Sequence, residues 1–360
     1  MSGELADRYP HRMAGHCGSG ALRDLLHWQG LGWAGPPGEG LVFALGGALG
    51  LSFVRSSQLS PPVYLVGRET DYEVALPRRL GAQVEVLATD DPETGWTWVT
   101  REVDAGRPVL IWADIAELPY LNVQLQMSRH DVVVIGYDLD RQTALVVDND
   151  RAEAQLVPLT ALARARASNG FPEPTMHRTY RIVWPRQLPP IAGVAADAFR
   201  RSANAMRHPS GPGIAGVTGT GSRGLSAANH LVTELRSWVD VPPPDVDRLL
   251  FALYAFIEKA GTGGGLFRRL FADGSTEIAR LTGDLPTQRV ASCARRCSDA
   301  WSELAGIAKD RGTSTQTRTA AIARAAAAIP AAEEDLVVAL ESASRSLQNL
   351  GHGNRPDGPG

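Results

Sequence analysis

The sequence is poor in cysteine: its 360 residues include three, at positions 17, 293 and 297. So few thiols exclude a disulfide-rich secreted scaffold and are typical of a chain in a reducing compartment. An excess of charge is also missing, because 36 lysines and arginines stand against 39 aspartates and glutamates. Since the two signs are interspersed, we expect no nucleic-acid partner and no anionic membrane surface as partner.

Long hydrophobic runs are missing as well. The longest, Gly40 to Val54, is shorter than the roughly 18 residues of a membrane span, and it is rich in glycine. We therefore expect a buried helix there. The first residues, MSGELADRYPHR, lack the apolar segment of a secretory signal. Together these absences predict a cytoplasmic protein without a membrane segment.

The length exceeds the roughly 100 to 200 residues of one domain, and the pattern changes near Trp184. Before it, short β-branched runs alternate with helical patterns, which is typical of an α+β fold. After the proline-containing segment 185–190, only helical spacing recurs. We predict an α+β domain over residues 1–186, a mostly α-helical domain over residues 187–350 and a disordered tail over residues 351–360.

Local patterns place the elements more closely. Helical spacing in the first part predicts helices over residues 18–28, 72–80 and 96–105. Strands are expected over residues 63–66, 83–87, 109–112 and 178–184. The segment 130–150 reads as a hairpin with its turn near residues 138–141. Helical spacing in the second part covers residues 195–206, 225–239, 246–260, 290–308 and 319–347, the last interrupted at Pro330.

Cys17 stands at the start of the first of these helices, in the segment GHCGSGALRDLL. A helix N-terminus favours the thiolate, the form in which cysteine is a nucleophile, through its dipole and its unsatisfied N–H groups. We expect the small residues Gly15, Gly18, Ser19 and Gly20 to leave a substrate room to reach the sulfur. The same backbone N–H groups could hold a developing oxyanion. The pattern predicts a nucleophilic cysteine, whereas a free cysteine is otherwise a small buried hydrophobe.

His130 is the best candidate for the base that such a thiol needs. If the hairpin turn is centred near Leu139, pairing by equal distances puts His130 opposite Asp148. A carboxylate there would fix the tautomer of the imidazole and leave its other nitrogen for the thiol. The prediction is a Cys/His/Asp triad, with Asn149 and Asp150 as alternatives if the register slips. The competing interpretation is a structural histidine at a strand end.

These segments also carry a resemblance to a known family. HCGSGALRDLLHWQGL, GEGLVFALGGALGLSF, VLIWADIAELPY and HDVVVIGYDLD resemble the butirosin biosynthesis protein H family, which is itself similar to bacteriocin-processing cysteine peptidases and papain. EKAGTGGGLFRRLF resembles the helical domain that often accompanies it. The resemblance implies a papain-like cysteine-enzyme domain followed by a helical domain.

The resemblance further implies acyl transfer from a carrier protein's phosphopantetheine thioester to a small-molecule amine acceptor. Cys17 would be the acylated nucleophile, His130 the general base and Asp148 the residue that orients it. Papain-like enzymes often place a glutamine six residues before the cysteine to complete the oxyanion hole. His11 stands there in this sequence and could donate in its place. No cofactor or metal is implied, apart from phosphopantetheine carried by the donor.

Two carboxylates are weaker candidates for a substrate-binding role. Glu39, just before the longest apolar run, could line the cleft and bind an amine, or could cap the following helix. Asp114 follows a predicted strand and could face the pocket or sit in a turn. Two other functions also fit the same residues: a peptidase, amidase or thioesterase that uses water as acceptor, and a binding protein whose cleft is catalytically idle. The oligomeric state is not predicted from the sequence.

Overall fold

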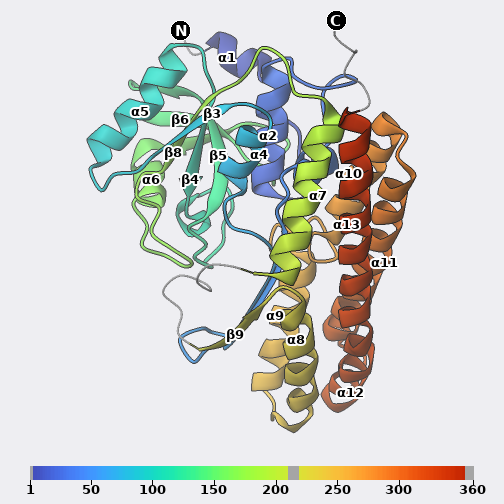
Figure 1. The fold of residues 1–360 in the computed structure, drawn as a ribbon. Helices are drawn as coiled ribbons and strands as arrows, with labels where there is room; N and C mark the ends of the chain where they lie inside the picture. Colours follow the sequence, from blue (N-terminus) through green and yellow to red (C-terminus); the bar gives the residue numbers. More distant parts are fainter. Residues whose placement is uncertain (1–2, 210–218, 353–360) are drawn as a thin grey trace, which may run out of the picture. The chain divides into compact units, whose positions relative to one another are not determined.

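A computed structural model describes residues 3–209 and 219–352, and within it the chain forms two units (Figure 1). The first unit takes the residues up to 37 and residues 77–188, and the second takes residues 38–76 and those from 189 onward. The chain thus passes from one unit to the other after Pro37, returns after Leu76 and passes again after Leu188. Residues 38–76, which the sequence placed in the first domain, instead pack in the second unit. A mixed α and β part is followed by a helical C-terminal part, as predicted.

The first unit is built on a six-stranded sheet in which every neighbouring pair is antiparallel. In spatial order the strands are β3 (Gln83–Leu87), β8 (Thr179–Val183), β4 (Val109–Ala113), β5 (His130–Asp138), β6 (Thr143–Val147) and β7 (Gln155–Pro158). The central strands β4 and β5 are buried almost throughout. Their apolar runs therefore form the core of this unit, and the two ends of β5 carry its polar residues.

Helices pack on this sheet from the flanking segments. They are α1 (Gly3–Arg8), α2 (Cys17–Trp28), α5 (Pro92–Asp104), the 3-10 turn η1 (Ile115–Glu117) and α6 (Leu159–Arg166). Helix α4 (Tyr72–Arg79) bridges the point where the chain returns from the second unit. Helix α2 packs against β5 through a buried apolar stripe that includes Leu22, Leu25 and Leu26. This packing brings the start of α2 to the sheet.

The second unit is mostly helical and also contains a three-stranded antiparallel sheet in the order β2-β1-β9. Its strands are β1 (Leu49–Arg55), β2 (Val63–Arg68) and β9 (Thr220–Arg223). Its helices are α3 (Glu39–Leu45), α7 (Ile191–Arg207), α8 (Leu225–Ser237), η2 (Trp238–Asp240), α9 (Asp245–Glu258), α10 (Arg268–Thr282), α11 (Leu285–Lys309), α12 (Thr315–Ala325), η3 (Ala326–Ala328) and α13 (Ile329–His352). Phe43 of α3 stacks on Phe267 and meets Phe271 edge-on, which explains why residues 38–76 belong here.

Two sequence predictions were wrong in this unit. The apolar run from Gly40 to Val54 is not one helix: α3 ends at Leu45, and β1 begins at Leu49. Gly47 has φ +58°, which ends the helix, and the following residues then pair as a strand. Strands also do not stop after Trp184, because β9 pairs with β1. The residues of β9, TGSR, have no apolar pattern, so only their backbone pairing with β1 makes them a strand.

The interruption predicted near Pro330 is confirmed: α12 ends at Ala325, the 3-10 turn η3 covers Ala326–Ala328, and α13 begins at Ile329. Pro330 is the second residue of α13, a position where a helix N–H has no intrahelical partner. A proline is tolerated at this position, so the interruption falls just before Pro330 and a new helix starts there. Of the predicted tail, residues 353–360 lie outside the described residues, and residues 351–352 end α13. Within residues 3–209 and 219–352, no helix is long and apolar enough to cross a membrane.

A buried ion pair ties the second unit together. The Arg268 side chain is fully buried, and its guanidinium donates through Nε and Nη2 to the two carboxylate oxygens of Glu333, at 2.9 and 3.0 Å. Its remaining donors reach the carbonyls of Gly67, Leu266 and Gly50 at 2.8 to 2.9 Å. Trp301 Nε1 also donates to Glu333, at 2.7 Å. This arginine is therefore structural, and the helix that it begins is held by satisfied buried charges.

Candidate active site

Cys17 is the first residue of α2, as the sequence predicted for a cysteine at a helix start. His16 caps the helix, and its Nδ1 accepts a hydrogen bond from the Ser19 backbone N–H at 3.2 Å. The cysteine is 9% exposed, so its surface is small but not closed. Gly18 follows in the first turn, where backbone N–H groups lack a preceding carbonyl partner.

The segment before the cysteine is fastened to the end of the hairpin. Ala14 donates its N–H to the Asn149 carbonyl at 2.9 Å, and Asn149 Nδ2 donates to the Ala14 carbonyl at 3.0 Å. A Cβ on Gly20 would lie 2.5 Å from the Ala14 Cβ. Gly20 is therefore needed for this close packing. Gly18, Ser19 and Gly20 are all buried, and Gly20 is the one whose small size is required by the neighbouring chain.

His130 and Asp148 lie together at the end of the sheet. His130 Nε2 lies 2.7 Å from Asp148 Oδ2, and the carboxylate is fully buried. Tyr120 donates its hydroxyl to the same oxygen at 2.6 Å, and the Asp150 N–H reaches Oδ1 at 3.2 Å. Because the acceptor is a carboxylate, Nε2 of His130 must carry the proton. The other ring nitrogen is then left for a second partner.

The register that joins them differs from the predicted one. The pairs run from Asp138–Thr143 to Val133–Val147, with a shift between Val134 and Gly136. Continued by one residue, this register puts Asp148 opposite Val132, so His130 is two positions away. The two side chains meet diagonally, which is within reach across an antiparallel pair. The turn is therefore later than predicted, yet the contact with Asp148 forms.

The Cys17 side chain acts on His130 through hydrogen bonding and through its charge. Burial disfavours the charged imidazole, but the Asp148 carboxylate and the Cys17 sulfur outweigh it and raise the pKa of His130 well above its ordinary value. Burial likewise opposes the ionised form of Asp148, and His130 and Tyr120 outweigh it, so the pKa of Asp148 is lowered. These two pKa shifts favour a protonated His130 beside an ionised Asp148, with the Cys17 sulfur as the other neighbour.

Sequence reasoning missed a second carboxylate beside the thiol. Asp131 is 1% exposed, and its Oδ2 accepts from Cys17 Sγ at 3.8 Å. Asp131 opens the apolar run of β5 directly after His130. A carboxylate that starts a buried strand is unusual, and this could have marked it from the sequence. Tyr120 carried no such signal, because only the fold brings its loop to Asp148.

His11 is engaged by partners other than a substrate. Its Nδ1 lies 3.0 Å from Asp24 Oδ2 and its Nε2 2.7 Å from the Arg151 carbonyl. Burial opposes the charged form, but both hydrogen bonds and the Asp24 charge outweigh it and raise the pKa of His11. With both nitrogens so occupied, this imidazole has no proton left for an oxyanion. It instead ties the segment before Cys17 to the residues after Asp148.

The two weaker candidates lie elsewhere. Asp114 is fully buried and caps η1: its Oδ1 accepts from the Ala116 and Met127 N–H groups, and its Oδ2 accepts from Ser168 Oγ at 2.6 Å. The Asp114 carboxylate therefore accepts hydrogen bonds within its own turn, in agreement with the alternative that Asp114 is a turn residue. Glu39 is the first residue of α3 and belongs to the second unit. A carboxylate at this position stabilises the N-terminus of the helix.

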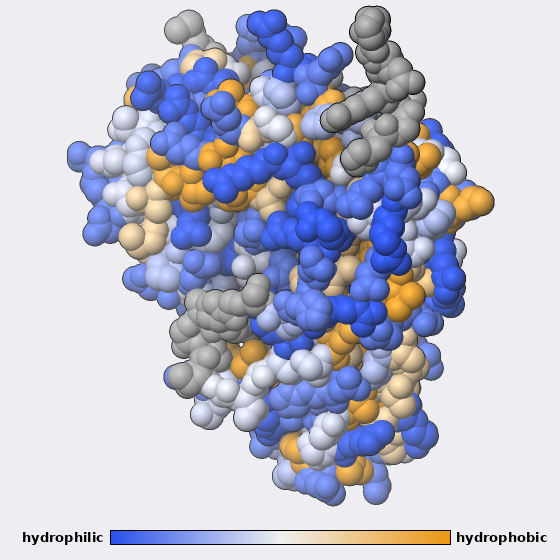
Figure 2. Space-filling model, viewed as in Figure 1, coloured by the Kyte–Doolittle hydropathy of each residue, from blue (hydrophilic) through white to orange (hydrophobic). Residues whose placement is uncertain are grey.

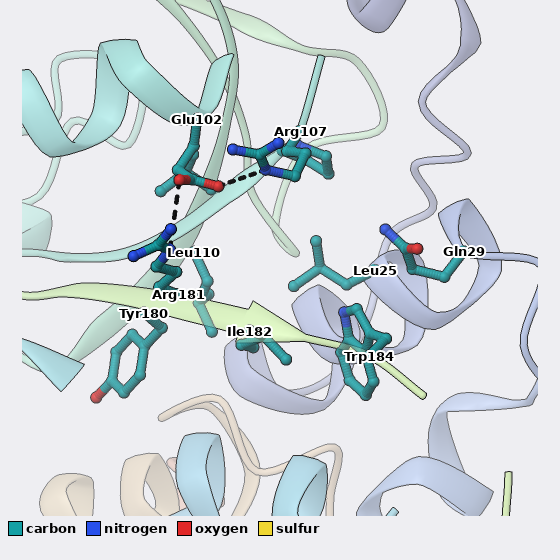
Figure 3. A pocket seen from close by; sticks show the side chains of 11 residues that line it. Leu25, Gln29, Glu102, Arg107, Leu110, Tyr180, Arg181, Ile182 and Trp184 are labelled. Atoms are coloured by element: carbon teal, nitrogen blue, oxygen red, sulfur yellow. Dashed lines mark hydrogen bonds and ion pairs between the residues drawn. The ribbon is translucent and has the colours of Figure 1, made fainter. Parts of the chain in front are cut away.

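The first unit has a further hollow that does not serve this site. It lies between the end of α2 and strands β4 and β8, and Figure 3 shows Leu25 and Trp184 on one side and Glu102 with two arginines on the other. Glu102 accepts from Arg107 at 2.6 Å and pairs with Arg181 at 3.6 Å. The volume of about 30 Å³ suits one water molecule, and the charges satisfy one another.

Comparison with protein families adds an independent line of evidence. The family model described as butirosin biosynthesis protein H, N-terminal, matches residues 16–149, which contain Cys17, His130 and Asp148. The model described as a domain of unknown function, DUF4872, matches residues 160–340, half of the chain. The chain belongs to the butirosin biosynthesis protein H-like family. Membership of this family indicates an enzyme of natural-product biosynthesis. No curated protein matches the chain.

Proposed function

We propose that this family member is an acyltransferase that carries an acyl or aminoacyl group on Cys17 and delivers it to an amine. The observation that supports this most is the continuous series of contacts from Cys17 through His130 to Asp148. A thiol, an imidazole and a carboxylate in this order are the components of nucleophilic acyl transfer. The same arrangement on an α+β unit is what a papain-like enzyme would have.

In the first half-reaction the Cys17 thiolate attacks the carbonyl carbon of a thioester. The tetrahedral intermediate collapses with cleavage of the bond to the donor sulfur, and His130 gives its proton to that departing thiolate. An acyl thioester on Cys17 and a neutral His130 remain. The raised pKa of His130 suits this step, because the imidazole starts as the acid.

In the second half-reaction an amine attacks the acyl-Cys17 carbonyl. Neutral His130 takes the amine proton, the amide forms, and Cys17 leaves as a thiolate beside the imidazolium. Asp148 holds Nε2–H throughout, so the other ring nitrogen is the one that exchanges the proton. Two substrates can thus use one site in turn.

For the developing oxyanion we propose backbone donors in the first turn of α2, with Gly18 N–H as the principal one. Such donors need no reorganisation during the reaction and can contribute roughly 3 to 4 kcal/mol of stabilisation each. His11 is not part of this proposal, because Asp24 and Arg151 hold its two nitrogens.

The family suggests the kinds of substrate. An acyl carrier protein with its phosphopantetheine thioester is the proposed donor, and a small-molecule amine such as an aminoglycoside is the proposed acceptor. No bound cofactor enters the mechanism. The thiol supplies the covalent step, and the protein supplies the acid–base group.

The test is mass spectrometry of the protein after incubation with an acyl carrier-protein thioester. We expect the acyl mass on the Cys17 peptide and on neither Cys293 nor Cys297, which are buried in the second unit. The variant Cys17→Ala should remain unmodified. An unacylated wild-type protein would contradict the proposal. Addition of an amine should then release an amide; free acid with and without amine would indicate a hydrolase.

A further inference from the structure

A cavity in the first unit lies apart from the Cys17 residues and has no role in the mechanism. It opens between α5 and α6, has a volume of about 280 Å³, and is close to the smallest sites that hold small molecules. Figure 2 shows hydrophobic surface gathered beside these two helices. The apolar side chains that line it are Pro92, Trp96, Leu159, Leu162 and Ala163. Pro92 and Ala163 are exposed at the rim, whereas Leu162 is buried, as are the polar residues Arg166 and His177 that also line the cavity.

One of these groups is a buried cation without an anion. Arg166 lines the cavity and is 1% exposed. The other buried arginines of the described residues each pair with a carboxylate: Arg23 with Asp24, Arg268 with Glu333 and Arg318 with Asp247. Arg166 has only neutral acceptors, namely the Gly95 carbonyl at 3.2 Å, the His177 carbonyl at 2.8 Å and Thr179 Oγ1 at 2.8 Å.

The cost of burying Arg166 without a carboxylate is reflected in the pKa of its guanidinium. Burial lowers the pKa of Arg166 to about 9, which leaves it charged at neutral pH. A buried charge is normally paired, because its desolvation is otherwise uncompensated. Within the part of the chain that the structure describes, no side chain supplies the missing negative charge. An external anion is the simplest group that would.

His177 is a second unsatisfied group that lines the same cavity. It is 2% exposed, and neither of its ring nitrogens has a hydrogen-bond partner among the described residues. Its ring lies over Gly95, where a Cβ would come within 2.6 Å of the His177 Cβ. Burial and the Arg166 charge outweigh the Asp91 carboxylate and lower the pKa of His177, so the ring is neutral and can donate one hydrogen bond.

We propose that this cavity binds a small monoanionic carboxylate with an aromatic or branched aliphatic body. The body would lie against Trp96 and Leu162, and the carboxylate would point toward Arg166 and His177. Glu93 stands exposed at the rim and disfavours a second negative charge on the ligand. The site is separate from acyl transfer at Cys17, so it does not depend on the proposed function.

The experiment is calorimetric titration of the full chain with three probes of one shape: phenylacetate, phenylacetamide and phenethylamine. We expect saturable one-to-one binding of phenylacetate, at least tenfold weaker binding of the amide, and none of the amine. Ala163→Trp at the rim should fill the cavity and abolish binding. Ala154→Trp, at an exposed position of the same unit outside the cavity lining, should leave binding unchanged.

Each other outcome overturns the proposal. Equal binding of acid and amide would mean that the cavity is only an apolar surface, and no saturable binding at millimolar probe would mean that it is not a carboxylate site. Phenylacetate binding that survives Ala163→Trp would place the ligand elsewhere. An unchanged rate of Cys17 alkylation in Ala163→Trp would show that the variant is folded, so loss of binding could be assigned to the cavity.

Discussion

Tyr120 and His130 hydrogen-bond to the same carboxylate oxygen, Oδ2 of Asp148, at 2.6 and 2.7 Å. The tyrosine comes from the loop after η1 and the histidine from the start of β5. Their convergence on one oxygen stabilises the ionised carboxylate, and with it the tautomer of His130 that faces the thiol. Tyr120 is therefore a positioning residue for the proposed reaction, acting through Asp148.

Tyr120→Phe tests this role. The change removes one of the hydrogen bonds that lower the pKa of Asp148, so that pKa should rise and the acid limb of the pH–rate profile should move to higher pH. We expect kcat/KM at neutral pH to fall by about 10-fold, since hydrogen bonds to charged groups contribute about 1.5 to 3 kcal/mol. Tyr137→Phe, which removes a hydroxyl bonded to Asp104 on the surface, is the control. Equal profiles for both variants would refute the role.

Asp131→Asn tests the carboxylate beside the sulfur. A negative charge 3.8 Å from Sγ disfavours the thiolate, so its removal should move the midpoint of Cys17 alkylation by iodoacetamide to lower pH. The shift should be on the order of one pH unit, equivalent to about 1.4 kcal/mol. Asp138→Asn, at the far end of the same strand, should leave the midpoint in place. An unmoved midpoint in Asp131→Asn would show that this carboxylate does not govern the thiol.

Glu333→Gln tests the buried ion pair of the second unit. It would leave Arg268 charged and fully buried without its carboxylate, so the free energy of unfolding should fall by about 3 to 5 kcal/mol. Glu334→Gln is the matched control, because its side chain is 46% exposed and pairs with Arg207, and it should cost less than about 1 kcal/mol. Urea unfolding of both variants measures the difference. Similar losses would mean that the buried pair contributes no more than a surface one.

The raised pKa of His11 predicts a pH-dependent stability. Because the folded-state pKa lies above the unfolded value, the stabilisation is fully present below about pH 6.5 and is lost as the pH rises through the folded-state pKa. The difference in melting temperature between wild type and His11→Gln should therefore be largest near pH 6 and shrink toward alkaline pH. His130 titrates in both proteins, so its contribution cancels. A difference that grows with pH would contradict the assignment.

The sequence by itself determined the local features of this protein. The glycine-flanked start at Cys17, the apolar spacing of α2 and the β-branched runs of β5 and β6 depend on neighbouring residues, so periodicity predicted them. It also paired His130 with Asp148, since hairpin partners are close in sequence. Helical and strand periodicity and hairpin pairing predict these features because each depends on residues that are close in the sequence.

The tertiary structure decided what depends on distant residues. The two-residue difference in register, the convergence of Tyr120 on Asp148 and the carboxylate of Asp131 at the thiol arise from how separate segments pack. The same holds for β9, which is a strand only because β1 offers it hydrogen bonds. Hydrogen bonds and charges between residues far apart in the chain have no sequence period, so only the folded chain brings them into view.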